Sequence, residues 1–270
     1  MFLFLLCVCA GCREKKNTSM VIKVMDGLQE GLPGLDVAYD CDGNVIQYGN
    51  TSIRYKGDQI IVGAMDMSEP DGKLLEAVFV IGKGRAQESR ARCMLKTENG
   101  ELEVEKQTTY KYRPDALKIT SNYYSVADRK FIRNVEGEYV FDDEKRITEV
   151  NFVYREANDS VYSRYFCYNY DNNLSFESNL NLQAYMIEHD GVDSFLFFLL
   201  NLAQISYGSL PNDIVAYSSE SDGMAFKRHA NYRMAGEKVT RLEILYGRAN
   251  LVLRLDLSYS NEELIMKSEE

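Results

Sequence analysis

Three consecutive acids could supply the carboxylate pair that glycoside hydrolysis needs. Asp142, Asp143 and Glu144 lie in the stretch "YVFDDEKRITEV" (139–150), and two bases follow them at once. A hydrolytic pair must face each other across the substrate. Successive strand residues instead point to opposite faces, and turn side chains point mostly outward. The cluster therefore predicts a solvated turn, with Phe141 and Ile147 directed into the core.

Histidine chemistry has equally little to build on. His189 and His229 are the only histidines, and Asp190 and Ser194 lie near the first. A Ser–His–Asp triad is defined by geometry, and the nucleophile elbow G-x-S-x-G does not occur. The glycines of "GKGR" (82–85) lack the helix and the Lys-Ser/Thr of a phosphate loop. We therefore expect a hairpin turn there, structural or surface histidines, and a protein that is not an enzyme.

The spacing of the potential ligands does not match that of known metal sites. The stretch "DCDGN" (40–44) resembles the middle of a calcium loop, but the first and twelfth ligand positions would fall on Ala38 and Gly49, which offer no side-chain oxygen. Cysteines in zinc sites come in spaced pairs, and the sequence has no CxxC motif; its cysteines are Cys7, Cys9, Cys12, Cys41, Cys93 and Cys167. The last three are compatible with buried thiols or with one disulfide. We expect no cofactor and no metal.

Cys12 carries the chemistry that the sequence does predict. The chain begins "MFLFLLCVCAGC" and then turns polar with "REKKNTS" (13–19). Such an apolar stretch ending in small residues is typical of a secretory signal and is too short to span a bilayer. The small-small-Cys ending resembles the lipobox of bacterial lipoproteins, in which the cysteine is diacylated and becomes the first mature residue. We expect a signal peptide at 1–11 and lipidated Cys12 with a flexible tether at 12–19; the alternative is a buried N-terminal strand.

The overall charge limits the partners. With 41 acidic and 31 basic residues the formal net charge is −10. A sequence-independent grip on nucleic acid needs a basic face, so no nucleic-acid partner is expected. The basic run after Cys12 differs from the acidic run that, by resemblance, marks surface-exported lipoproteins. A periplasm-facing position in the outer membrane is therefore the expected location.

The elements that would hold any site are almost all strands. Ten β-branched or aromatic stretches are separated by turn residues, and only four prolines interrupt the chain. Because strands do not alternate with helices, the class is mainly β. We expect a single domain at 20–267, an antiparallel β-meander that forms a curved sheet or a barrel-like fold.

A short repeat punctuates this meander. In "YDCDGNV" (39–45), "FDDEKRI" (141–147) and "YDNNLSF" (170–176), an aromatic residue is followed by Asp, and an apolar residue lies six positions after the aromatic. The pattern predicts that the aromatic ends one strand and the apolar residue begins the next on the same face, with the acid in the reversal.

One segment departs from the strand pattern. From Asp193 to Tyr207 the chain is apolar almost all round, which indicates a short buried helix at about 193–207. Asp193 or Ser194 can cap its first turn, and Gly208 can close its end. We expect this helix to fill the concave side of the sheet.

Together the lipobox-like start, the aromatic–Asp turns and "NLAQISYGSLPNDIVAY" (201–217) resemble a family of Bacteroidales-type lipoproteins. That family carries a domain of unknown function described as having a porin-like fold. The resemblance covers most of residues 30 to 260. It implies an envelope-anchored β-sheet and lends no site residues.

The function expected from these observations is non-enzymatic. A lipid-anchored envelope protein with a structural role, or accessory to an envelope complex, has the membrane as its first partner. The alternative is a glycan- or lipid-binding module that uses the aromatic-rich concave face, since 19 tyrosines and 12 phenylalanines could stack on a ligand. A glycan, a lipid or an envelope protein is then the second partner.

Overall fold

The computed structural model describes residues 19–26, 35–40, 42–66, 73–97, 100–170, 181–204, 211–218, 223–236, 238–246 and 250–259. The expected signal peptide, Cys12 and nearly all of the expected tether lie outside these residues. Ser19, which was assigned to the tether, is instead the first residue of a strand.

Seventeen strands make up most of the described chain. They are β1 (Ser19–Asp26), β2 (Leu35–Tyr39), β3 (Val45–Tyr48), β4 (Thr51–Lys56), β5 (Gln59–Val62), β6 (Met65–Asp66), β7 (Lys73–Gly82), β8 (Arg85–Thr97), β9 (Gly100–Tyr112), β10 (Ala116–Ser125), β11 (Phe131–Phe141), β12 (Ile147–Glu156), β13 (Val161–Tyr170), β14 (Pro211–Ser218), β15 (Gly223–Ala235), β16 (Lys238–Tyr246) and β17 (Asn250–Tyr259). A 3₁₀ turn, η1 (Leu182–Tyr185), and one helix, α1 (Val192–Leu199), lie between β13 and β14.

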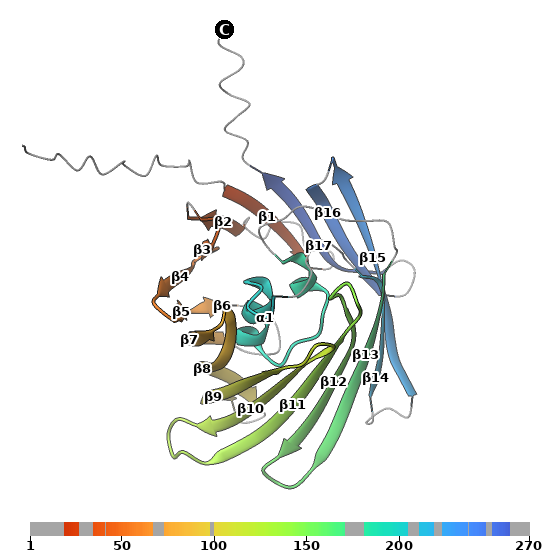
Figure 1. Ribbon diagram of the computed structural model, residues 1–270. Helices are drawn as coiled ribbons and strands as arrows, with labels where there is room; N and C mark the ends of the chain where they lie inside the picture. The colour runs from red at the N-terminus through yellow and green to blue at the C-terminus, as the bar shows by residue number, and fades with distance from the viewer. Residues whose placement is uncertain are drawn as a thin grey trace, which may run out of the picture.

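The strands pair antiparallel in chain order. Each strand from β7 to β17 pairs with the next, and β5 pairs with β7 beside the two-residue β6. β1 pairs with β2 on one side and with β17 on the other, so the sheet curls until its last strand meets its first (Figure 1). The predicted fold class, a curved antiparallel meander around a short buried helix, is confirmed.

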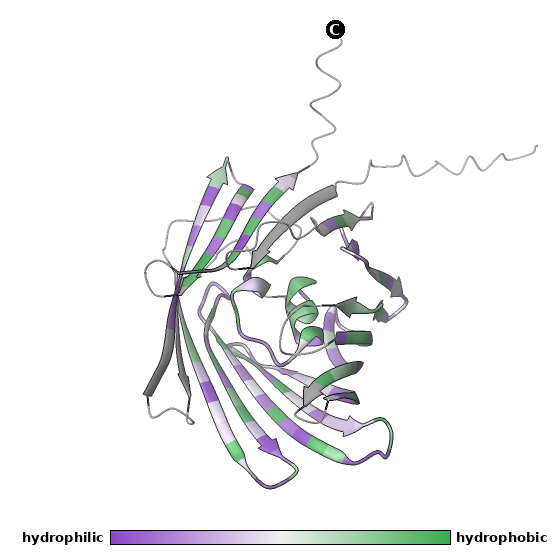
Figure 2. Ribbon diagram, turned by 180° about the vertical axis from the view of Figure 1, so that it is seen from behind, coloured by the Kyte–Doolittle hydropathy of each residue, from purple (hydrophilic) through white to green (hydrophobic). Residues whose placement is uncertain are grey.

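Side chains alternate between the two faces of this sheet. Along β10, Leu117, Ile119, Ser121 and Tyr123 are buried on the concave face, and the residues that alternate with them, Lys118, Thr120 and Asn122, are partly exposed. Figure 2 shows the same alternation of hydrophilic and hydrophobic residues along the long strands. Charged pairs lie across the convex face, including Arg129–Glu105 and Arg155–Glu136, each at 3.0 Å. The apolar core therefore lies inside the curve, around α1.

The sheet has two ends that differ in what they carry. Met20 pairs with Tyr259, so the first and last described residues lie at one end, which we call the terminal end. The registers place the turns of β2–β3, β4–β5, β7–β8, β9–β10, β11–β12 and β15–β16 at this end too. The turns of β8–β9, β10–β11 and β12–β13 lie at the other end, the opposite end.

The aromatic–Asp repeat is confirmed where it is described. Phe141 pairs with Ile147 across the β11–β12 turn. Within that turn, Asp142 Oδ1 accepts hydrogen bonds from the backbone N–H groups of Glu144 (3.0 Å) and Arg146 (2.9 Å). The first copy has the same arrangement: Tyr39 pairs with Val45, and Asp40 Oδ1 accepts from the N–H groups of Asp42 (2.9 Å) and Asn44 (2.8 Å). The reversal of the third copy, after Tyr170, lies outside the described residues.

One detail of the turn differs from expectation. Ile147 is fully buried, but Phe141 is only partly buried against the core. Asp142 and Arg146, expected to face water, keep only 23% and 15% of their side chains exposed, because Arg146 Nε donates to Asp142 Oδ2 at 2.6 Å. The Arg146 guanidinium also covers the Tyr170 ring. Asp143, Glu144 and Lys145 face water as predicted.

The helix begins and ends at residues other than those predicted. Its N-cap is Gly191, with φ +89° and no side-chain cap, so capping by Asp193 or Ser194 was wrong; both lie inside the first turn. The helix ends at Leu199 rather than near 207. Asn201 adopts φ +50°, and the N–H groups of Asn201 and Leu202 donate to Phe198 O (2.9 Å) and Phe197 O (3.0 Å). This is a Schellman ending, with Asn in the place usually taken by Gly.

Within the described ranges, no helix has the length and apolar character required to cross a bilayer.

Candidate functional site

A lysine points into the apolar interior. Val104, Lys106, Thr108 and Tyr110 alternate along β9, and all four are buried on the concave face. Lys106 keeps only 1% of its surface exposed. A buried ammonium group is costly unless it is paired and hydrogen-bonded, so its partners define the strongest candidate site in the described chain.

The partners of Lys106 come from the start of α1. Lys106 Nζ lies 3.0 Å from Asp193 Oδ1 and 3.2 Å from Asp190 Oδ2. It also donates to Ser194 Oγ at 3.1 Å and to the backbone carbonyl of Asp190. Asp193 and Ser194 stand in the first helical turn, where the N-terminal end of the helix dipole favours a carboxylate.

A second cation balances the second carboxylate. Arg133, on β11, has Nη2 3.8 Å from Asp190 Oδ1, and its guanidinium lies 4.4 Å from the centre of the Tyr123 ring. The Tyr123 hydroxyl donates to the Asp190 carbonyl at 3.4 Å. Lys106, Arg133, Asp190, Asp193 and Ser194, which we call the ionic cluster, thus hold two positive and two negative formal charges.

The pKa of Lys106 indicates that its ammonium group stays charged. Burial alone would lower the pKa of Lys106, but the carboxylates of Asp190 and Asp193 outweigh it and hold that pKa well above its usual value. Burial raises the pKa of Asp193, and the Lys106 ammonium opposes this rise. Because a protonated amine has no lone pair to attack with, Lys106 is not a nucleophile in this arrangement. The cluster acts as a neutral clamp between helix and sheet.

The residues considered for a catalytic triad are not arranged as one. His189 Nε2 donates to Ala184 O at 2.6 Å, and its ring packs against Phe195 and Phe198. Burial lowers the pKa of His189 to about 4. Ser194 Oγ donates to the Asp190 carbonyl at 3.1 Å. Both groups therefore bond to backbone carbonyls, while His229 lies in β15.

The ionic cluster is one of several attachments of the segment 181–204, which we call the inserted segment. Tyr139 OH donates to Glu188 O at 3.2 Å, and Glu188 N donates to Tyr168 OH at 2.9 Å. Further hydrogen bonds fix both ends of the segment: Tyr48 OH with Tyr185 OH, Ala86 N to Leu202 O, Tyr112 OH to Leu202 O, Arg85 Nε to Gln204 Oε1 and Gln204 Nε2 to Gly84 O. The segment is thus bonded to strands around much of the sheet.

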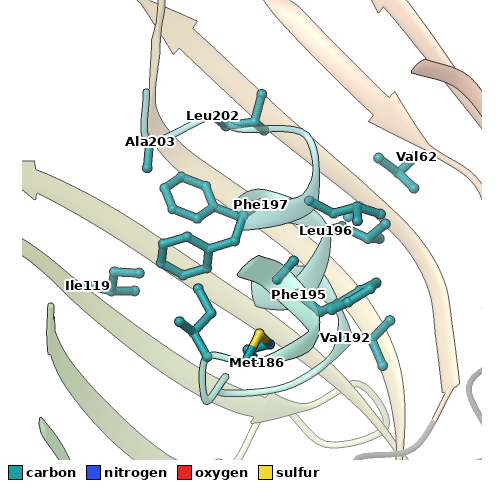
Figure 3. Packing of buried hydrophobic residues seen from close by; sticks show 14 of the residues in the cluster. Val62, Ile119, Met186, Val192, Phe195, Leu196, Phe197, Leu202 and Ala203 are labelled. Carbon is teal, nitrogen blue, oxygen red and sulfur yellow. The ribbon is translucent and has the colours of Figure 1, made fainter. Parts of the chain in front are cut away.

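Aromatic packing fills the space between these attachments. Phe195, Phe197 and Phe198 of α1 are almost completely buried. Figure 3 shows Phe195 and Phe197 among the other apolar side chains around the helix. Phe197 stacks on Tyr110 with ring centres 4.3 Å apart and planes at 7°, and Phe198 lies 4.7 Å from the Tyr139 ring. The aromatic rings of the concave face are therefore covered by the helix.

An open depression lies on the other side of the sheet wall, near the terminal end. It has a volume of about 550 Å³ and is lined by Asp40, Ile46, Ile53, Arg54, Tyr55, Lys56 and Ile61. Tyr55 is 41% exposed. The lining combines two cations, the Asp40 carboxylate, an exposed ring and apolar side chains.

The remaining expectations concern cysteines and metals. Cys93 and Cys167 are free thiols, Cys93 buried and Cys167 partly so, whereas Cys12 and Cys41 lie outside the described residues. In the part of the chain that the structure describes, three or more His, Cys, Asp or Glu side chains never gather closely enough to hold a metal ion. The stretch around Asp40, which mimics a calcium loop, forms the β2–β3 turn.

Lys106 was missed by sequence reasoning. The stretch "ELEVEKQTTYKY" (101–112) reads as charged on both faces, which hides the alternation of Val104, Lys106, Thr108 and Tyr110. Its burial could have been predicted because Lys106 lies two residues after Val104 and four before Tyr110, and residues an even number of positions apart in a strand point to the same face. Its partners lie more than 80 positions away, so the pattern could not name them.

Comparisons with known proteins agree with this architecture. A protein-family model matches residues 21–257. Among curated proteins, no relative matches the chain. A solved porin-like protein from Bacteroides vulgatus is 46% identical, with 89% of this chain and 97% of that chain covered and a TM-score of 0.81. A porin-like protein from Bacteroides uniformis is 10% identical, with 90% and 96% covered and a TM-score of 0.54, which shows likeness of fold alone.

The resemblance drawn from the turns and the apolar segment is thereby confirmed. A solved relative aligns with this chain over 97% of its own length, at 46% identity. The chain belongs to the family of porin-like proteins that the Bacteroides vulgatus structure represents.

Proposed function

We propose that the protein is a non-catalytic, lipid-anchored component of the bacterial cell envelope, with a structural role or as an accessory to an envelope complex. Cys12 is the anchor, and the β domain stands on the periplasmic side of the outer membrane. The observation that carries the proposal is the filled interior: Phe197, Phe198 and Leu196 are fully buried where a pore or a deep ligand cavity would need open space.

The charges inside the molecule support a role without catalysis. The buried carboxylates of Asp190 and Asp193 are matched by Lys106 and Arg133. Catalytic groups need a proton or a lone pair to exchange near neutral pH. A lysine held protonated by two carboxylates has no lone pair, and its raised pKa means that it does not readily give up its proton near neutral pH. It serves to position α1.

The sequence and the relatives support the envelope location. The "AGC" ending of the apolar start matches a lipidation site at Cys12. The 46% identical relative is a porin-like protein from Bacteroides vulgatus. A protein held by lipid chains can expose a polar convex face to water, as the ion pairs across β8, β9, β11 and β12 require.

Metabolic labelling with an alkyne analogue of palmitate tests the anchor. The full chain is expressed in a Gram-negative host as wild type, Cys12→Ala and Cys9→Ala. We expect label on wild type and on Cys9→Ala, which keeps the small residues before Cys12, and none on Cys12→Ala. Equal labelling of Cys12→Ala would refute the anchor.

A second candidate function is binding of a glycan or lipid. The concave aromatic face is covered by α1, which disfavours that face as the binding site. The open depression beside Tyr55 favours this candidate instead, since an exposed ring flanked by Arg54 and Lys56 suits a sugar carrying negative charge. A glycan array with the full chain and with Tyr55→Ala tests it: reproducible binding that Tyr55→Ala abolishes would establish a binding module.

A further inference from the structure

We infer that the terminal end of the sheet faces the bilayer and that the opposite end points away from it. This inference rests on the proposed acylation of Cys12 and adds to it a defined contact surface and orientation. It follows from where the described chain begins, how far the anchor lies from that point, and how tall the sheet is.

The topology collects many features at the terminal end. Ser19 and Tyr259 are there, and so are both described aromatic–Asp turns, at 40–44 and 141–147. β13 ends and β14 begins there too, because Tyr170 of β13 pairs with Pro211 of β14. An anchor that precedes Ser19 therefore attaches to this end.

The reach of the connecting chain excludes the inverted orientation. From Cys12 to Ser19 there are seven residue steps, which span at most about 25 Å when fully extended. The longest strands, β8 and β9, have 13 residues each. At ~3.3 Å per residue and a tilt of about 40°, such a strand gives a height of roughly 33 Å. An inverted molecule would hold Ser19 farther from the bilayer than the chain can reach.

The opposite end also carries residues that could contact a bilayer. Phe131 and Val161 are 42% and 62% exposed, and both start strands there. Exposed apolar side chains can insert into a bilayer interface. If they did so here, the molecule would have to lie on its side, with both ends close to lipid. The two arrangements therefore predict different distances for the two ends.

The turn residues of the terminal end suit the surface of a bilayer rather than its interior. Asp143, Glu144 and Lys145 are exposed at the tip of the β11–β12 turn, and Asp42 is exposed in the β2–β3 turn. Both signs of charge are present, so this end can lie against headgroups without either burying in lipid or depending on anionic lipid. Attachment then comes from the acyl chains and orientation from the short connection.

Energy transfer to a lipid acceptor tests the orientation. Single fluorophores are placed at Asp143→Cys on the terminal end and at Ala127→Cys on the opposite end; both positions are exposed. To restrict labelling to the introduced cysteines, the background carries Cys41→Ser and Cys167→Ser. The buried Cys93 is left in place. Cys12 is also kept, because acylation would block its thiol. The acylated full chain is reconstituted in phosphatidylethanolamine–phosphatidylglycerol vesicles with a headgroup-labelled acceptor. We expect transfer from position 143 to exceed transfer from position 127 several-fold.

Flotation of the vesicles separates the two ways of failing. If the wild-type chain floats with vesicles and Cys12→Ala does not, the anchor stands, and equal or reversed transfer from the two positions overturns the orientation alone. If the wild-type chain neither carries acyl groups nor floats, the proposed function fails and the orientation falls with it. The Cys12→Ala chain supplies the baseline, with equal low transfer from both positions.

Discussion

Replacing Lys106 with Met is the sharpest test of the ionic cluster. Methionine keeps most of the length and apolar volume of the lysine stem but removes the charge. Asp193 would then lose its 3.0 Å partner, and Asp190 would keep only Arg133 at 3.8 Å. Breaking a buried ion pair from one side typically costs about 3–5 kcal/mol, because the remaining charge stays buried without compensation. We expect the free energy of unfolding to fall by that amount.

Urea denaturation followed by far-UV circular dichroism or tyrosine fluorescence measures the loss, since the chain has 19 tyrosines and no tryptophan. Arg92→Met is the matched control. Arg92 pairs with Glu103 on the convex face with 53% of its side chain exposed, and exposed pairs contribute little to stability. Asp193→Asn combined with Lys106→Met should recover part of the loss, because the orphaned charge is removed.

The effect of Lys106→Met should also depend on pH. Burial already raises the pKa of Asp193, and removing the opposing ammonium raises it further. A folded-state pKa above the unfolded value stabilises the fold at low pH and destabilises it as pH rises through that pKa. The deficit relative to wild type should therefore be largest near neutral pH and shrink on acidification. A deficit below about 1 kcal/mol at neutral pH, or strict additivity with Asp193→Asn, would refute the clamp.

Three further outcomes follow from named contacts. Phe197→Ala should destabilise by about 3–5 kcal/mol, measured by the same denaturation, because it removes a fully buried ring that stacks on Tyr110; a loss under about 1 kcal/mol would show that the helix packs loosely. Asp142→Ala should lower the free energy of unfolding by roughly 1–2 kcal/mol, since it removes two hydrogen bonds to the backbone and an ion pair. Asp143 is exposed, so Asp143→Ala should lower it by less than about 0.5 kcal/mol. Equal losses for the two variants would contradict the turn geometry. The pKa of His189 in the fold is about 4, so as pH falls the unfolded chain binds a proton at this residue before the folded chain does. The free energy of unfolding should therefore fall between about pH 6.5 and pH 4 by on the order of 2–3 kcal/mol. His189→Gln should flatten that part of the pH–stability curve, and an unchanged slope would show that another group titrates there.

Local patterns carried much of the fold. The aromatic–Asp reversal depends on one carboxylate accepting neighbouring N–H groups, a contact made within five residues. Asp40 and Asp142 were therefore identifiable from spacing, as were the cross-strand pairs that flank them. The apolar run from Phe195 to Leu199 likewise indicated a buried helix, because a helix that is apolar all round is typically buried on most of its faces.

What could not be predicted depends on contacts between distant segments or on backbone strain. Asn201 in a left-handed conformation ends the helix, and Asn adopts that conformation less often than the Gly208 that was expected to do so. Lys106 reads as a surface residue until Asp190 and Asp193 are brought beside it. Likewise, the pairing of β1 with β17 joins residues at the two extremes of the described chain, which no local pattern specifies.

The double pairing of β1 has a mechanical consequence for an anchored molecule. If Cys12 carries the proposed lipid anchor, a force on the anchor reaches the body through Ser19, the first residue of β1. β1 is held by seven register pairs to β17 and by four to β2. A pull along the axis loads these hydrogen bonds together in shear, rather than opening them one after another as peeling would. β1, which joins the two edges of the sheet, is thus also the strand that would carry the mechanical load of the anchor.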